Sequence, residues 1–198
     1  MKTAALLALL IAVALAVAWF IFSKPAYPLT QEDAKKFFLE DLQGKYPLAD
    51  IREVVEIAAM NSSDGTPYFQ LKARVTNGIN TPCPERLDVH YDYPPKNFVA
   101  QLPEYITRGC KVCLNQPSCV IAFPEEAIIA SHTYNGTQEV SDFIKANADA
   151  KADTSLVENY GEVSGVWLVN WSSASSASGY RVVLSKSQNK ILEVSRTG

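Results

Sequence analysis

The chain begins with a long apolar segment, AALLALLIAVALAVAWFIF at residues 4–22, which contains no charge, proline or glycine. As a helix rising ~1.5 Å per residue, it would span roughly 28 Å, close to the ~30 Å hydrocarbon thickness of a bilayer. We therefore predict a transmembrane signal anchor over residues 1–24 and a tether over residues 25–29. A cleaved signal peptide is the alternative, because residues 16–18 read Ala-Val-Ala, a small-x-small pattern.

Hydrophobic periodicity then predicts an amphipathic helix in the segment QEDAKKFFLEDLQGK, where Ala34, Phe37, Phe38 and Leu42 fall on one face. Thr30 occupies the expected N-cap position of this helix.

Three strands are predicted after the helix, at residues 51–60, 68–76 and 86–93, because apolar residues alternate with polar ones. In the first strand, we expect Val55, Ile57 and Ala59 to face inward. In the other two, we expect the intervening charged residues to face solvent. Residues 30–95 thus form a first predicted module of one helix and a sheet.

Residues 96–136 show less periodicity and hold three of the four cysteines, so we predict an irregular connector there. Within it, Pro124 to Ala130 fits a short helix or a strand equally well. The adjacent acidic pair Glu125 and Glu126 is expected to diverge in space or lie in solvent.

Residues 137–198 repeat the order of helix and strands. A helix is expected from Thr137 to Ala150, and Ser172 to Gly179 is expected to be a flexible loop. The predicted strands are 156–163, 166–172, 180–185 and 190–196. The aromatic side chains of this and the first module are interpreted as core residues rather than a binding surface: Trp167, Trp171, Tyr91 and Tyr93.

A family resemblance follows from the leading helix, the strand GVWLVNW and the closing segment YRVVLSKSQNKILEVSRT. Together these features make residues 137–197 resemble a PepSY-type domain, with Asn189 in the turn position where the family has glycine; Asn can also adopt a positive φ. Residues 30–93 are similar to the cystatin-like arrangement of a helix across an antiparallel sheet. The resemblance implies exported or membrane-bound modules with binding or peptidase-modulating roles, and no catalytic residues.

The predicted fold class is therefore α+β. A transmembrane helix at the N-terminus is followed by two cystatin/PepSY-like helix-on-antiparallel-sheet modules, and a cysteine-containing irregular segment joins them.

The four cysteines, Cys83, Cys110, Cys113 and Cys119, suit two disulfides in an exported protein, and the sequence leaves all three pairings open. One alternative is a redox pair of Cys110 and Cys113. The other is a zinc site built from all four cysteines.

Three Asn-x-Ser/Thr sequons provide candidate glycosylation sites at Asn61, Asn135 and Asn170, all of which we expect to be exposed. His90 and His132 lie in no recognisable metal or catalytic spacing and are interpreted as surface residues.

The net charge and the absence of known catalytic motifs reduce the number of function classes that the sequence allows. The formal net charge of −3 disfavours nucleic-acid binding, which requires a basic surface. The sequence contains no GxSxG, HExxH, P-loop or GxGxxG motif, so we predict no catalytic residue, cofactor or metal ligand.

The leading hypothesis is a non-catalytic binding or assembly module of the cell envelope. It would be held in a cell membrane by one span through residues 4–22, with its C-terminal domain outside the cytoplasm and a protein or peptide as its partner. One alternative is an envelope thiol-disulfide oxidoreductase that uses Cys110 and Cys113. Another is a pilin-like filament subunit.

Overall fold

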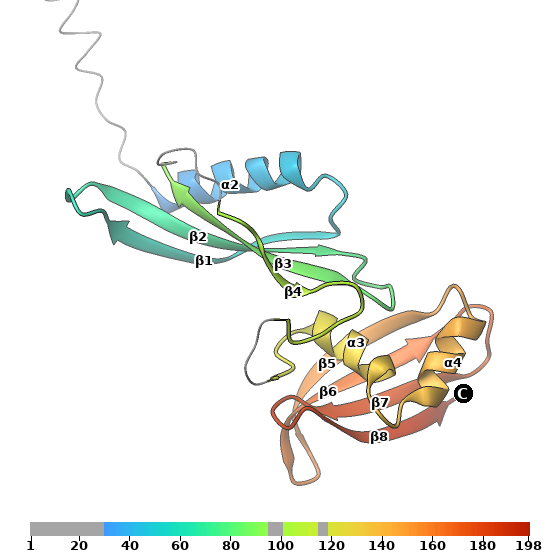
Figure 1. Ribbon diagram of the computed structural model, residues 1–198. Helices are drawn as coiled ribbons and strands as arrows, with labels where there is room; N and C mark the ends of the chain where they lie inside the picture. The colour runs from blue at the N-terminus through green and yellow to red at the C-terminus, as the bar shows by residue number, and fades with distance from the viewer. Residues whose placement is uncertain (1–29, 95–100, 115–118) are drawn as a thin grey trace, which may run out of the picture. The chain divides into compact units, whose positions relative to one another are not determined.

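The structure, a computed structural model, describes residues 30–94, 101–114 and 119–198 (Figure 1). In the described residues, eight strands form two four-stranded antiparallel sheets, each with its strands paired in chain order. The helices are α2 (Gln31–Lys45), α3 (Pro124–Thr133) and α4 (Gln138–Ala146). The strands are β1 (Ile51–Asn61), β2 (Pro67–Asn77), β3 (Glu85–Tyr93), β4 (Glu104–Thr107), β5 (Lys151–Tyr160), β6 (Val163–Ser172), β7 (Gly179–Ser185) and β8 (Lys190–Thr197).

The predicted α+β fold class is wrong, because the described residues are mostly two antiparallel sheets with only three helices. The connector that we expected to be irregular supplies strand β4 to the first sheet and contains helix α3. The helix expected to reach Ala150 ends at Ala146, and a strand begins at Lys151.

None of the described helices is long and apolar enough to cross a membrane. The predicted anchor over residues 1–24 and the tether over residues 25–29 lie outside the described residues.

Helix α2 packs its apolar face on the first sheet. Ala34, Phe38 and Leu42 are fully buried there, as the periodicity predicted. They share a hydrophobic core with inward-facing residues of β2 and β3: Leu71, Ala73, Val75, Leu87 and Val89. Phe37 departs from the prediction and is 46% exposed, with its ring beside those of Tyr91 and Tyr93.

Strand β1 contains a bulge that reverses part of the predicted inward face. Its register with β2 shifts between Val54 and Glu56. A bulge adds one residue to a strand, so the side chains on either side of it change faces. Val54 and Ile57 therefore pack against the core, whereas Val55 is 47% exposed.

The second sheet packs one face against α3 and α4. Trp167, Val169 and Trp171 of β6 are buried in this core, so both tryptophans are core residues as predicted. Each buried indole also satisfies its N–H group, since Trp167 Nε1 donates to the Ile121 carbonyl at 2.8 Å and Trp171 Nε1 donates to Ser131 Oγ at 2.9 Å.

Two turns of the second sheet follow from local chemistry. Asn189 adopts a φ of 50° in the β7–β8 turn, which confirms the expectation that an asparagine here can take a positive φ. The serine-rich loop after β6 is held by Asp149, whose carboxylate accepts hydrogen bonds from Ser173 Oγ at 2.7 Å and Ser175 Oγ at 2.8 Å. These two hydroxyl groups lower the pKa of Asp149 to about 2.

Two matched substitutions test the bulge. Val75→Ala removes a fully buried side chain and should lower the free energy of unfolding by about 2 kcal/mol. Val55→Ala makes the same chemical change at the exposed bulge and should alter it by less than about 0.5 kcal/mol. Urea unfolding of both variants measures the difference, and equal losses would show that Val55 faces the core.

Candidate functional site

The four cysteines form two disulfides, Cys83–Cys110 and Cys113–Cys119, which confirms the favoured interpretation. The Cα atoms are 4.8 Å apart in the first pair and 5.3 Å apart in the second, both within the usual range for a disulfide. The first disulfide ties the loop between β2 and β3 to the segment that follows β4. The second closes a short loop before α3.

This pairing bears on both alternatives for the cysteines. Cys110 and Cys113 belong to different disulfides, so they do not form a dithiol–disulfide pair with each other. All four sulfur atoms are engaged in disulfides, and none is a free thiol that could join a four-cysteine zinc site.

A buried ionic cluster lies where the first turn of α3 meets the first sheet. The side chain of Glu125 is fully buried. One of its carboxylate oxygens, Oε1, accepts hydrogen bonds from Arg74 Nη2 at 2.6 Å, Arg74 Nε at 3.0 Å and Thr76 Oγ1 at 2.5 Å. The other, Oε2, lies 3.7 Å from Arg86 Nη1. Two residues of β2 thus donate hydrogen bonds to Oε1 in place of water, and Arg86 of β3 offers Oε2 a positive charge without a hydrogen bond.

The cluster continues along β3 through Asp88, which is 1% exposed. Its carboxylate pairs with Lys72 Nζ at 2.8 Å and lies 3.4 Å from Arg86 Nη2. The Arg86 guanidinium also lies over the ring of Phe123, 3.4 Å from the ring centroid, in a cation–π arrangement. Arg86 therefore contacts two carboxylates and an aromatic ring while being almost fully buried.

Glu126 points in another direction and binds backbone donors at the start of α3. Its Oε2 atom accepts hydrogen bonds from the N–H of Ala122 at 2.7 Å and of Phe123 at 3.1 Å. Burial raises the pKa of this carboxyl group, and nearby Glu125 raises it further, while the two backbone N–H groups and Arg86 oppose the change.

This cluster was not predicted from the sequence. The charged residues of β2 and β3 alternate with apolar ones, and we therefore expected them to face solvent. Glu125 and Glu126 were expected to diverge or to lie in solvent; they bind different partners, and both are buried. The residues that donate hydrogen bonds to Glu125 are about fifty residues away in the chain, and local periodicity cannot report such contacts.

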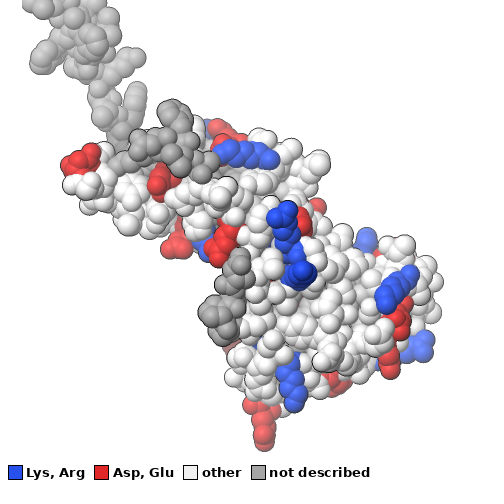
Figure 2. Space-filling model, viewed as in Figure 1, with Lys and Arg blue, Asp and Glu red and all other residues white. Residues whose placement is uncertain are grey.

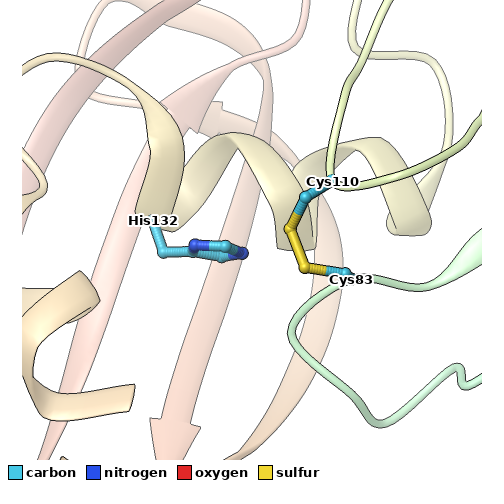
Figure 3. A group of neighbouring side chains, drawn as sticks. All are labelled: Cys83, Cys110 and His132. Carbon is cyan, nitrogen blue, oxygen red and sulfur yellow. A yellow bond between two sulfur atoms is a disulfide. The ribbon is translucent and has the colours of Figure 1, made fainter. Parts of the chain in front are cut away.

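His132, near the end of α3, is half-buried rather than a surface residue. Its Nε2 atom lies 2.8 Å from the carbonyl oxygen of Pro82, and its ring meets that of Trp171 edge-on at 5.6 Å. Burial lowers the pKa of His132, although the hydrogen bond to Pro82 acts in the opposite direction. Figure 3 shows its ring directed at the Cys83–Cys110 disulfide. These three side chains form the one group in the described residues whose atoms are close enough to hold a metal ion.

The sequon asparagines differ in exposure. Asn61 and Asn135 are exposed, whereas Asn170 is half-buried on β6 and its Oδ1 atom accepts a hydrogen bond from Arg181 Nε at 3.1 Å. Thr137, the third residue of the Asn135 sequon, is 1% exposed and donates its hydroxyl to the Tyr134 carbonyl. Glycan attachment at these sites stays a prediction.

Comparisons with known proteins give no relative: no family model, no curated protein and no solved structure matches the chain. The structure alone therefore defines the class of protein: the described chain forms two antiparallel sheets and contains two disulfides. The resemblance to PepSY-type and cystatin-like domains stays a prediction.

Removing the carboxylate of Glu125 tests the ionic cluster. Glu125→Ala leaves Arg74 without its buried counter-ion and leaves Arg86 with Asp88 as its one carboxylate partner among the described residues, and we expect the free energy of unfolding to fall by about 3–5 kcal/mol. Glu139→Ala, at an exposed position in the first turn of α4, is the matched control and should cost less than about 1 kcal/mol. Similar losses in the two variants would contradict the role given to Glu125.

A pH series tests Glu126. Its folded pKa is raised above the ordinary value of 4.5, so its contribution to stability is complete below that value and is lost as pH rises through the folded pKa. Glu126→Gln removes this loss, because a neutral amide can still accept the two backbone hydrogen bonds. The variant should therefore gain stability relative to the parent between about pH 4 and about pH 7. Chemical unfolding of both proteins at both pH values measures the gain. A difference in the free energy of unfolding that stays the same at the two pH values would refute it.

Proposed function

We propose that the chain is a non-catalytic, extracytoplasmic binding module that captures an extended segment of a protein or peptide partner along the free edge of β5. Two disulfides support the location, since such bonds persist in oxidising compartments. Membrane contact through residues 4–22 stays a prediction, because those residues lie outside the described part of the chain.

The observation that carries the proposal is the regularity of β5. Its register with β6 runs from Lys151 opposite Ser172 to Tyr160 opposite Val163 without a shift. No described strand pairs with its other edge (Figure 1). A long, regular edge offers a row of backbone N–H and C=O groups to an incoming strand.

The other sheet edges are less suitable in the described structure. The edge strand β1 is interrupted by its bulge at Val55, and β4 contains only four residues. The register of β8 with β7 shifts between Val183 and Leu184. Short strands and irregular pairing are common devices that block unwanted strand addition, and β5 has neither.

The side chains along β5 indicate the chemistry of the partner. Leu156 is 48% exposed and Tyr160 is 40% exposed, so an added strand would cover apolar surface. The strand and its turn carry one basic residue, Lys151, and three acidic ones, which are Asp153, Glu158 and Glu162. This acidic excess favours an extended segment in which apolar residues alternate with lysine or arginine.

Surface charge supports a protein or peptide partner over nucleic acid. On the face shown in Figure 2, the described basic side chains lie singly or in small groups, with acidic and uncharged residues between the groups, and form no broad basic patch. Nucleic-acid binding depends on neutralising successive phosphates, which requires such a patch.

Selection of a random peptide library on the immobilised full chain tests the proposal. We expect enriched peptides to alternate apolar and basic residues and to slow amide hydrogen exchange along β5, because their backbone would pair with that edge.

Two matched variants locate the site. Leu156→Lys should weaken binding of a selected peptide by more than about tenfold, because it replaces exposed apolar surface with a charge that repels the basic partner. Val55→Lys makes a similar change at a nearly equal exposure on β1 and should leave binding unchanged. Equal effects of the two substitutions, or exchange protection outside β5, would refute the proposed edge.

A further inference from the structure

The Cys83–Cys110 disulfide and His132 come from three separate parts of the chain. Cys83 belongs to the loop between β2 and β3, Cys110 follows β4, and His132 lies in the last turn of α3. The two sulfur atoms and a ring nitrogen all lie within 4.8 Å of one another. Figure 3 shows the imidazole edge facing the disulfide.

We propose that Cys83, Cys110 and His132 form a zinc-binding site when a dithiol reductant opens the disulfide. The dithiol transfers two electrons and two protons, the S–S bond breaks, two cysteine thiols form and the reductant becomes a disulfide. Zinc then replaces the two thiol protons and binds two thiolates and one imidazole nitrogen. Water fills the fourth position of the tetrahedron.

The spacing of the three side chains suits this ion. Zn–S bonds of about 2.3 Å and Zn–N bonds of about 2.0 Å place two ligands of a tetrahedral site roughly 3.5 Å apart. The sulfur atoms must separate from bonding distance to this spacing, and reduction releases them to do so. The imidazole nitrogen already lies within 4.8 Å of both, so side-chain rotations suffice to bring the three atoms together.

The surroundings of His132 favour coordination in its neutral form. Its Nε2 atom now faces the Pro82 carbonyl at 2.8 Å, immediately before Cys83 in the chain. Binding of zinc at Nε2 requires the proton to reside on Nδ1, so the metal exchanges this hydrogen bond for a stronger ligand bond. Zinc would then link three parts of the chain, α3, the β2–β3 loop and the segment after β4, in place of the disulfide and the hydrogen bond.

The second disulfide lacks this arrangement. Cys119 Sγ lies 3.6 Å from the hydroxyl of Tyr134, which is a poor zinc ligand at neutral pH because burial raises its pKa. No histidine or carboxylate in the described residues completes a metal-holding group with Cys113 and Cys119. The two disulfides therefore provide a matched comparison within one chain.

The experiment uses the full chain with Cys113→Ser and Cys119→Ser, which leaves Cys83 and Cys110 as its thiols after reduction. A phosphine reductant is used, because a dithiol would itself bind the metal. We expect one Co²⁺ per chain with a thiolate-to-cobalt charge-transfer band, and displacement of the cobalt by one Zn²⁺. The oxidised protein should show neither signal, and circular dichroism should show that the reduced protein remains folded.

Two controls decide the ligand set. His132→Gln should weaken zinc binding by more than about tenfold, since one of three protein ligands is lost, whereas His90→Gln should have no effect. The opposite pair variant, with Cys83→Ser and Cys110→Ser, keeps the thiols of Cys113 and Cys119, which have no histidine beside them in the described structure, and should bind at least about tenfold more weakly. Equal binding by the two pair variants, insensitivity to His132→Gln, no cobalt signal, or a reduced chain that is unfolded with and without zinc would each overturn the proposal.

Discussion

The burial of one carboxylate, that of Glu125, constrains how helix α3 packs. A buried carboxylate is tolerated only where cations and hydrogen-bond donors replace water, and Arg74, Thr76 and Arg86 supply these from β2 and β3. The following residues of the same helix, including Ala127 and Ile128, belong to the hydrophobic core of the second sheet. Helix α3 thus joins a polar contact with one sheet to an apolar contact with the other.

The far end of α3 has a second polar contact with the first sheet's loops, through His132 and the carbonyl of Pro82. This contact lies beside the disulfide that fixes the same loop to the segment after β4. The helix is therefore held near both ends by polar contacts with the first sheet and its loops, and between them by apolar packing.

The two sheets differ in which of their faces and edges are covered. The first sheet is covered on one face by α2 and carries the ionic cluster with α3 on charged residues of its other face. The second packs α3 and α4 on one face and leaves β5 at an open edge. An interaction along that edge adds backbone hydrogen bonds without disturbing the buried charges. The proposed binding edge and the buried ionic cluster therefore lie on different parts of the chain.

Several features that depend on neighbouring residues were predicted correctly from the sequence. These include helix α2 with its buried face, the alternation in β2, the core tryptophans of β6, the positive φ at Asn189 and the presence of two disulfides. Each follows from local periodicity, turn chemistry or cysteine count, which a linear pattern records directly.

The tertiary structure alone decided the pairing of the cysteines, the reversed face at Val55, the mostly β character of the described chain and the burial of Glu125. A charged residue that alternates with apolar ones is expected to face solvent unless an opposite charge packs against it. For Arg74 that opposite charge is Glu125, which lies 51 residues later in the chain. Such contacts depend on which segments meet in space, and periodicity along the chain carries no information about that meeting.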